Sequence, residues 1–145
     1  MAKLRHVAMV VKDLDNTAAF YQKVFEMERA FEVKGTVVYL SDGTMNLALI
    51  QERPESSSAT GGKLGVHHFG FTVEDFKAAE EALTAAGATY AFDLGNPDGM
   101  NYERKWNDPE GYLFDISVKG WYGALNEATP ETAKTPAKEK ADAVS

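Results

Sequence analysis

The chain has 145 residues, of which 44% are hydrophobic, and a formal net charge of −7. That length suits a single compact domain, and the acidic balance excludes the classes of protein that bind nucleic acid or anionic membranes through a basic surface. The chain has no apolar run near the ~20 residues that cross a bilayer. It has no cysteine, so a metal site would have to use His, Asp or Glu. We expect a cytoplasmic protein whose partner is a small molecule, with no nucleic acid and no membrane.

The first part of the chain predicts one helix among four strands. A strand at Arg5–Val11 is followed by a helix at about Asn16–Met27, for which Asp13 and Asp15 offer capping oxygens. Turn residues "KG" and "SDG" then separate three short strand patterns. These strands are Arg29–Val33, Val37–Leu40 and Asn46–Ile50.

The second part predicts the same order of elements. Residues 51–65 are a polar, Ser/Gly-rich linker without periodicity, and from about residue 126 the composition shifts to Ala, Thr, Pro, Lys and Glu. We therefore expect a single domain over residues 1–124 and a disordered tail over 125–145. The elements between linker and tail are a strand at His67–Val73, a helix at Asp75–Ala86 and strands near Ala88–Phe92, Asn101–Trp106 and Tyr112–Val118.

A short repeat supports the duplication. "HVAMVVKDL" aligns without gaps with "HFGFTVEDF", which matches His6 with His68 and Asp13 with Asp75. Successive strand residues point to opposite faces, so His67 faces away from His68 and is expected to be a packing or interface residue. The predicted fold class is α+β, with two βαβββ modules (1–50 and 66–124) forming a curved mixed sheet around a metal-centred cavity.

The repeated histidines and one acidic residue predict the metal site. Asp115 stands alone in the apolar strand "YLFDISV", and burying an isolated carboxylate is costly unless it is paired, hydrogen-bonded or bound to a metal. Related strands should bring His6 and His68 together across a shared groove. A divalent cation held by His6, His68 and Asp115 would supply the missing charge. The competing interpretations are that His6 is an ordinary core residue and that Asp115 pairs with Lys105 or Arg104 of the neighbouring strand.

The strand "NYERKWN" offers polar groups on both of its faces. Tyr102 and Arg104 share one face, and Glu103 and Lys105 share the other. The face that points inward would supply an acid/base or an anion-binding group. We predict Tyr102 and Arg104 as the catalytic residues. The groove itself is expected to be lined by the small or apolar residues that share a face with the ligands: Ala8, Val10, Gly70, Thr72, Leu113 and Ser117.

Three stretches of the sequence stand out together: "LRHVAMVVKDLDNTAAFYQKVFEM", "VHHFGFTVED" and "WNDPEGYLFDIS". They resemble the vicinal oxygen chelate (VOC) superfamily, which includes glyoxalase I, extradiol dioxygenases, methylmalonyl-CoA epimerase and the fosfomycin and bleomycin resistance proteins. The resemblance implies metal ligands at His6, position 48, His68 and Asp115. Position 48 is alanine, which leaves three ligands and an open face, similar to the extradiol dioxygenases. Gln51 is a possible fourth ligand.

The resemblance therefore favours a dioxygenase-like enzyme that chelates neighbouring oxygens of a small organic substrate on one divalent metal ion. Fe(II) or Mn(II) is favoured, while Ni(II), Co(II) and Zn(II) also suit imidazole and carboxylate ligands. Two alternatives stay open: a glyoxalase- or epimerase-like lyase or isomerase, and a non-catalytic drug-binding protein. A homodimer is expected, and the site lies within one chain or between two.

Overall fold

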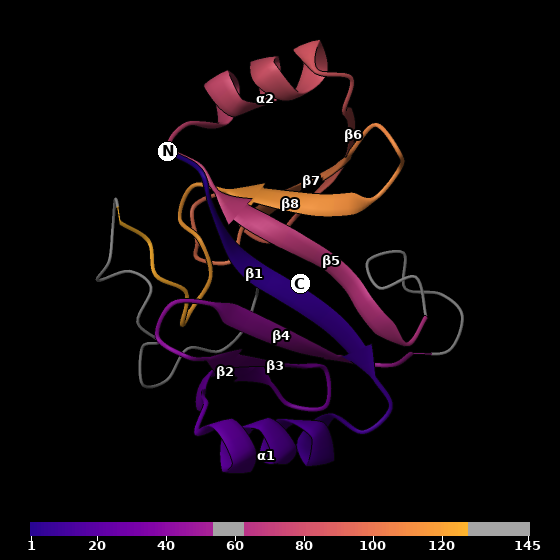
Figure 1. Ribbon diagram of the computed structural model, residues 1–145, viewed down its shortest axis with the longest axis vertical. Helices are drawn as coiled ribbons and strands as arrows, with labels where there is room; N and C mark the ends of the chain where they lie inside the picture. Colours follow the sequence, from indigo (N-terminus) through magenta and orange to yellow (C-terminus); the bar gives the residue numbers. More distant parts are fainter. Residues whose placement is uncertain (54–62, 128–145) are drawn as a thin grey trace.

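Eight strands form one mixed sheet in the computed structural model, which describes residues 1–53 and 63–127 (Figure 1). The predicted α+β class and the two βαβββ modules are confirmed. In chain order the elements are β1 (Lys3–Val11), α1 (Leu14–Phe25), β2 (Glu28–Val33), β3 (Val37–Ser41), β4 (Asn46–Gln51), β5 (Gly65–Thr72), α2 (Phe76–Ala85), β6 (Thr89–Leu94), β7 (Glu103–Asn107) and β8 (Leu113–Ser117).

The modules meet at the centre of the sheet, whose strand order is β2-β3-β4-β1-β5-β8-β7-β6. β1 and β5 pair antiparallel across the module boundary, and each pairs in parallel with the last strand of its own module, β4 or β8. The two strands that begin with the repeated histidine motif are therefore neighbours. This pairing gives the sheet the pseudo-two-fold arrangement that the repeat predicts.

Both helices begin at an aspartate of the repeated motif. Asp13 accepts a hydrogen bond from the backbone N–H of Asn16, and Asp75 accepts from Lys77 and Ala78. These carboxylates satisfy N–H groups that have no partner within the helix. The aspartates therefore explain why each first strand is followed at once by a helix, as the sequence predicts.

The two faces of the sheet have different roles. The outer face is covered in part by both helices: α1 packs on residues such as Met9 and Leu49, and α2 lies over residues such as Phe71 and Phe114. The inner face carries the alternate residues, which include His6 and His68. Because side chains alternate along a strand, the histidine pair points away from both helices.

The segment that follows β8 returns to fill the inner face of the first module. Trp121, Tyr122 and Ala124 join one buried cluster with inner-face residues of β1, β3 and β4, including Tyr39 and Ala48. The segment continues through residues 125–127, which lie in the predicted tail and are attached to the fold: the N–H of Leu125 donates to Thr44 and Arg5 donates to Glu127. The rest of the predicted tail, 128–145, and linker residues 54–62 lie outside the described residues.

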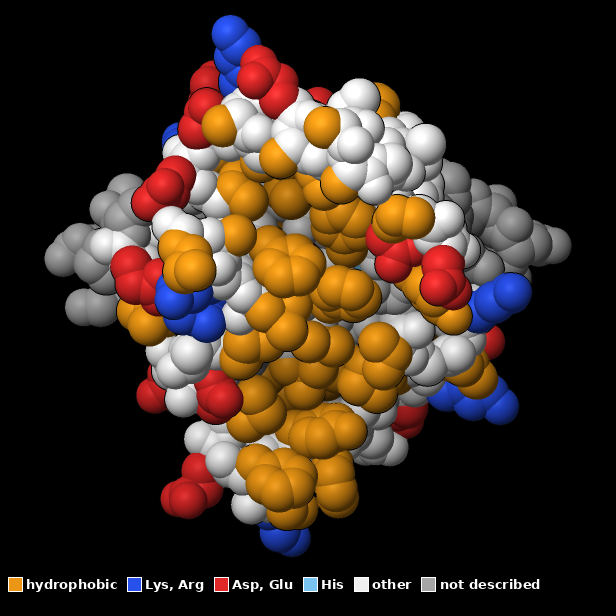
Figure 2. Space-filling model, turned by 45° about the horizontal axis from the view of Figure 1, so that its top comes forward, with side chains coloured by type: hydrophobic (Ala, Val, Ile, Leu, Met, Phe, Trp, Pro, Cys, Tyr) orange, Lys and Arg blue, Asp and Glu red, His pale blue; other side chains and the backbone are white. Residues whose placement is uncertain are grey.

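Hydrophobic side chains gather in a band on the face between the two helices (Figure 2). On α1, Phe20, Val24 and Phe25 are exposed, and Leu4 and Val66 on the central strands are exposed as well. An apolar groove of about 440 Å³ runs between α2 and the sheet, and it includes Phe71, Leu83 and Phe114 in its lining. Among the described residues, no helix is long and apolar enough to cross a membrane.

Candidate metal centre

Four side chains from four strands converge at the middle of the inner face. They are His6 of β1, His68 of β5, Glu103 of β7 and Asp115 of β8, and one nitrogen or oxygen of each lies within 4.8 Å of the corresponding atom in the others. All four side chains are 0–1% exposed. The structure thus brings together the three metal ligands that the sequence predicts, and it adds Glu103.

Strand register explains the convergence. β1 and β5 pair His6 with Gly70 and Ala8 with His68, so the two histidines lie diagonally across the strand boundary. β8 places Asp115 beside Gly70 on the other side. The two imidazole Nε2 atoms are 3.2 Å apart, and the Asp115 Oδ2 atom lies 3.1 Å from His68 Nε2 and 3.5 Å from His6 Nε2.

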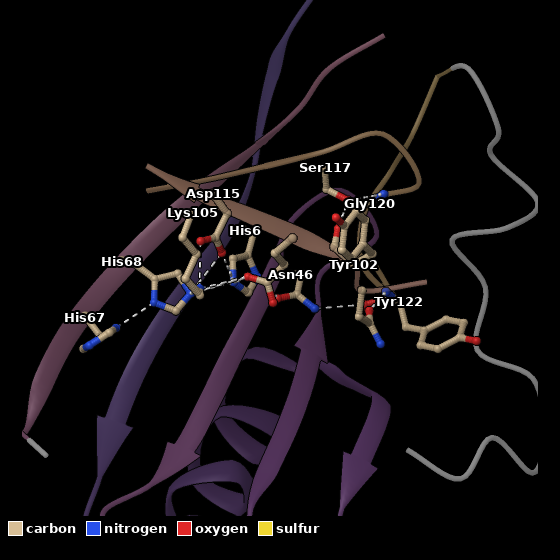
Figure 3. Close-up of polar contacts among 12 residues, drawn as sticks. His6, Asn46, His67, His68, Tyr102, Lys105, Asp115, Ser117, Gly120 and Tyr122 are labelled. Atoms are coloured by element: carbon tan, nitrogen blue, oxygen red, sulfur yellow. Dashed lines mark hydrogen bonds and ion pairs between the residues drawn. The ribbon is translucent and has the colours of Figure 1, made fainter. Parts of the chain in front are cut away.

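The outer ring nitrogens of both histidines are already engaged (Figure 3). Asn46 donates from Nδ2 to the Tyr122 carbonyl, which turns its Oδ1 toward His6 Nδ1 at 2.7 Å. His6 Nδ1 must therefore carry the proton, and its Nε2 presents a lone pair to the cluster. His68 Nδ1 lies 2.7 Å from the Nδ1 atom of half-buried His67, which can accept a hydrogen bond from it. This contact departs from the expectation that His67 faces away from His68 as a packing or interface residue. Orienting partners of this kind commonly fix the tautomer of metal-binding histidines.

A lysine also enters the cluster. The Lys105 Nζ atom donates to Asp115 Oδ1 at 2.8 Å and to Glu103 Oε2 at 3.2 Å, and it lies 3.4 Å from His68 Nε2. This ammonium is fully buried. The alternative interpretation in which Asp115 pairs with Lys105 therefore describes a contact that is present, alongside the convergence of the metal-ligand candidates.

Burial and neighbouring charges set the protonation states. Burial lowers the pKa of His6 to about 3 and also lowers the pKa of His68, so both rings are neutral. Burial alone would raise the pKa of Asp115, but the Lys105 ammonium holds it well below its ordinary value. Burial and the charge of Asp115 raise the pKa of Glu103 well above 4.5. The metal-free cluster thus holds two neutral imidazoles and an ionised Asp115 beside the Lys105 ammonium, while Glu103 binds its proton more tightly than an ordinary glutamate does.

The donor set fits a divalent metal ion. When both Nδ1 atoms carry the ring proton, the Nε2 lone pairs face each other and Asp115 Oδ2, a buried oxygen that has no hydrogen-bond partner among the described residues. Glu103 Oε1 is also buried and has no hydrogen-bond partner among the described residues. Lone pairs at such short distances repel unless a cation or a proton lies among them. Imidazole with carboxylate is a common ligand set for divalent transition metals, and the buried cluster suggests such a site.

The buried histidines predict that the metal-free protein loses stability on acidification. From pH 6.5 down to about 4.5 the unfolded chain gains protons at His6, His67 and His68, whose pKa values are lowered in the folded state, while the raised pKa of Glu103 acts in the opposite direction. The three histidines outweigh the one carboxyl group, and each net proton on the unfolded side corresponds to about 1.4 kcal/mol of stability lost per pH unit.

Urea unfolding of chelator-treated protein at several pH values measures this slope. The variant Glu103→Gln removes the opposing carboxyl group, so its slope should be steeper. A stability that stays constant over the same interval would contradict neutral, buried histidines.

The residues predicted as catalytic lie away from the cluster, on the other face of β7. Tyr102 donates to Asp93 at 2.6 Å, and Arg104 pairs with Glu80 of α2 at 2.5 Å while its guanidinium lies 4.1 Å from the Phe76 ring centre. The contacts of Arg104 attach α2 to the sheet, whereas the bond from Tyr102 reaches β6. The catalytic role of Tyr102 and Arg104 therefore stays a prediction, whereas Glu103 and Lys105 are the β7 residues that reach the site.

The structure also shows where three further residues lie relative to the cluster: Ala48, Gln51 and Trp121. Ala48 belongs to the buried apolar cluster of the first module and offers no ligand atom. Gln51 accepts a hydrogen bond from Leu14 N–H and donates to the Lys12 carbonyl, so both of its polar atoms are engaged at the end of β4. Trp121 was not predicted at the site, yet its ring stacks on His6 with centroids 4.5 Å apart and planes 6° apart.

The comparisons with known proteins agree with this architecture. Residues 3–116 match the Glyoxalase/Bleomycin resistance protein/Dioxygenase superfamily. The chain therefore belongs to this superfamily, the VOC proteins. Among curated proteins, none matches the sequence.

Several solved structures share the fold. A variant methylmalonyl-CoA epimerase from Streptomyces coelicolor, in complex with 2-nitronate-propionyl-CoA, is 22% identical with a TM-score of 0.62, over 79% of this chain and 94% of that one. The Mycobacterium tuberculosis methylmalonyl-CoA epimerase is 22% identical with a TM-score of 0.62, over 78% and 85%. An Mn(II)-bound glyoxalase from Novosphingobium aromaticivorans is 21% identical with a TM-score of 0.63, over 97% of this chain but only 42% of that one. At these identities the likeness establishes the fold alone.

Proposed function

We propose that this protein is a divalent-metal enzyme that moves a proton on a small organic substrate carrying two neighbouring oxygens. His6, His68 and Asp115 would hold the metal, and Glu103 would supply the second carboxyl group. The proposal depends chiefly on the position of Glu103, which is fully buried with its Oε2 atom 3.9 Å from both His Nε2 atoms. A bound metal would act as a Lewis acid toward the chelated oxygens.

The position of Glu103 favours an isomerase- or lyase-like reaction over an oxidation. The sequence favoured a dioxygenase because Ala48 removes a carboxylate that a glyoxalase- or epimerase-like reaction would use. β7 now brings a carboxyl group to the same cluster from a different strand. Proton transfer between neighbouring atoms needs a group whose pKa is raised toward neutrality by its surroundings, and Glu103 has a raised pKa. We therefore place isomerase- or lyase-like chemistry first.

The residues of this chain would have distinct tasks. Asp115, held ionised, would bind as an anionic ligand, and the two histidines would bind through their free Nε2 atoms. Glu103 would take the proton from the substrate carbon and return it. Asn46 would keep His6 in the required tautomer through the 2.7 Å contact between Asn46 Oδ1 and His6 Nδ1.

A dioxygenase remains the second candidate. Two histidines and one carboxylate on one face are the ligand set of many non-haem iron oxygenases, and His6, His68 and Asp115 make such a set without Glu103. Fe(II) or Mn(II) is accordingly the first choice of metal. Sequestration of a drug-like molecule needs no such convergence of metal-binding groups from both modules, so we rank the binding-protein alternative last.

Substitution of Glu103 by Gln separates the two reactions. The amide keeps the shape and an oxygen but removes the proton-transferring group, so we expect a fall of about 10²–10⁴-fold in turnover of an isomerised substrate. Metal content should stay near that of the wild type. Glu80→Gln, at a partly buried carboxylate of α2, is the matched control. Unchanged turnover in Glu103→Gln would contradict the assigned role.

The experiment for the function as a whole has two parts. Protein purified without chelator is analysed for metal, and one equivalent per chain is expected. The loaded protein is then incubated in deuterated water with 2-oxo and 2-hydroxy acids and thioesters, where deuterium uptake at the carbon beside the oxygen is expected. Oxygen consumption with catechols and no deuterium exchange would instead support the dioxygenase.

We also propose that the protein is a cytoplasmic homodimer. The support is the apolar band between the helices, since exposed hydrophobic surface of this extent is typical of interaction sites (Figure 2). Sedimentation equilibrium should give a mass near twice the 15.9 kDa of one chain. A mass of 15.9 kDa across the concentration range would contradict the dimer.

A further inference from the structure

Lys105 occupies the interior of the cluster with a full positive charge. Its ammonium lies 2.8 Å from Asp115 Oδ1, 3.2 Å from Glu103 Oε2 and 3.4 Å from His68 Nε2, so it contacts three of the four groups that would hold a metal. Its distances to Asp115 and Glu103 are those of charge-assisted hydrogen bonds. Lys105 is therefore placed as a cation in the space to which the ligand groups point.

We propose that Lys105 is a built-in competitor of the metal: its ammonium fills the cation site until a divalent ion displaces it, and so sets the affinity of the centre. The proposal builds on the metal-binding function proposed above. An ammonium has no lone pair and cannot be a ligand. A +1 charge this close to a divalent ion in a buried site is strongly repelled, so both cations cannot share these contacts.

The same contact gives the metal-free protein a stable folded state. Asp115 is ionised and fully buried, and an unpaired buried carboxylate is strongly destabilising. The Lys105 ammonium neutralises it in the absence of metal, and the flexible four-carbon stem allows the ammonium to leave when metal arrives. The contact between Lys105 and Asp115 thus lowers the affinity of the site for metal and raises the stability of the metal-free protein.

Lys105→Met tests the proposal, because methionine keeps the length and apolar character of the stem and removes the charge. Mn(II) and Zn(II) affinities are measured by calorimetry, and thermal unfolding is recorded with chelator and with excess metal. We expect metal binding at least tenfold tighter than in the wild type, a lower melting temperature with chelator, and a larger increase in melting temperature on adding metal. Lys77→Met, on the exposed surface of α2, is the matched control and should change none of these.

Lys105→Gln is a second variant that tests the proposal if Lys105→Met does not fold. Its amide can still donate to Asp115 and Glu103, but it carries no charge. It too should bind metal more tightly than the wild type. Equal or weaker binding in both variants, with a wild type that binds metal, would overturn competition and leave the metal centre in place. Absence of binding in the wild type and in both variants would overturn the proposed metal function itself.

Discussion

Replacement of Asp115 by alanine is expected to abolish metal binding and to destabilise the metal-free protein by about 3–5 kcal/mol. Among the four groups, Asp115 is the carboxylate whose pKa is held well below its ordinary value, and it also neutralises Lys105 at 2.8 Å. Its removal leaves the fully buried ammonium with the longer, 3.2 Å contact to Glu103. Metal content by mass spectrometry and urea unfolding with chelator measure the two effects.

Two further variants separate charge from packing. Asp98→Ala removes an exposed carboxylate and should alter neither quantity. The double variant Asp115→Ala/Lys105→Met removes both charges of the pair, so it should recover part of the lost stability while metal stays absent. Retention of metal by Asp115→Ala, or a destabilisation below 1 kcal/mol, would be incompatible with the assigned role.

Replacement of Trp121 by alanine is expected to open the site. The indole is fully buried, stacks on His6 and lies over Gly70, where an added Cβ would come within 2.7 Å of the ring. Removing a buried tryptophan costs about 3–5 kcal/mol. Because the cluster residues are almost fully shielded from solvent, we also expect a bound metal to be lost to an excess of chelator at least tenfold faster.

The matched control is Trp106→Ala. Trp106 is also buried, but it packs with Phe114 and Ile116 on the outer face of the sheet. A similar loss of stability is expected there, with the rate of metal loss unchanged. If both variants release metal equally fast, Trp121 is a packing residue and does not cover the site.

The repeated motif made the architecture predictable. Histidine and aspartate at matching positions predicted the alignment of the two modules, the capping aspartates Asp13 and Asp75, and the approach of His6 to His68 across the shared groove. Asp115 could be predicted because a lone carboxylate in an apolar strand needs a partner. These patterns lie within short stretches of the sequence, so they can be recognised without knowing which strands are neighbours.

The rest of the site depends on long-range contacts. Whether the odd or even residues of β7 face inward is set by its pairing with β8, where Lys105 lies opposite Asp115, and "NYERKWN" is polar on both faces. The prediction therefore favoured Tyr102 and Arg104 for catalysis over the pair that reaches the cluster. The alternation of side chains along a strand did offer a signal. If Lys105 faces Asp115, as the competing interpretation has it, then Glu103, two residues earlier, must lie on the same face.

Trp121 illustrates a second limit. It follows the last strand, in a segment whose sequence gives no strand or helix pattern, and its partner His6 lies far away in the chain. Only the return of residues 120–126 across the inner face of the first module brings them together. The missing side chain of Gly70 makes the room, which is a feature that no periodicity reveals.

In the proposed metal centre, one divalent ion is surrounded by four side chains: His6, His68, Glu103 and Asp115. A crystal structure of protein loaded with Zn(II), with anomalous data collected at the zinc edge, tests it most directly. We predict one strong peak per chain, about 2.0–2.2 Å from both His Nε2 atoms and from an Asp115 oxygen, with the Lys105 ammonium displaced. A peak elsewhere, or no peak with the ammonium still between Asp115 and Glu103, would show that these four side chains do not form a metal centre.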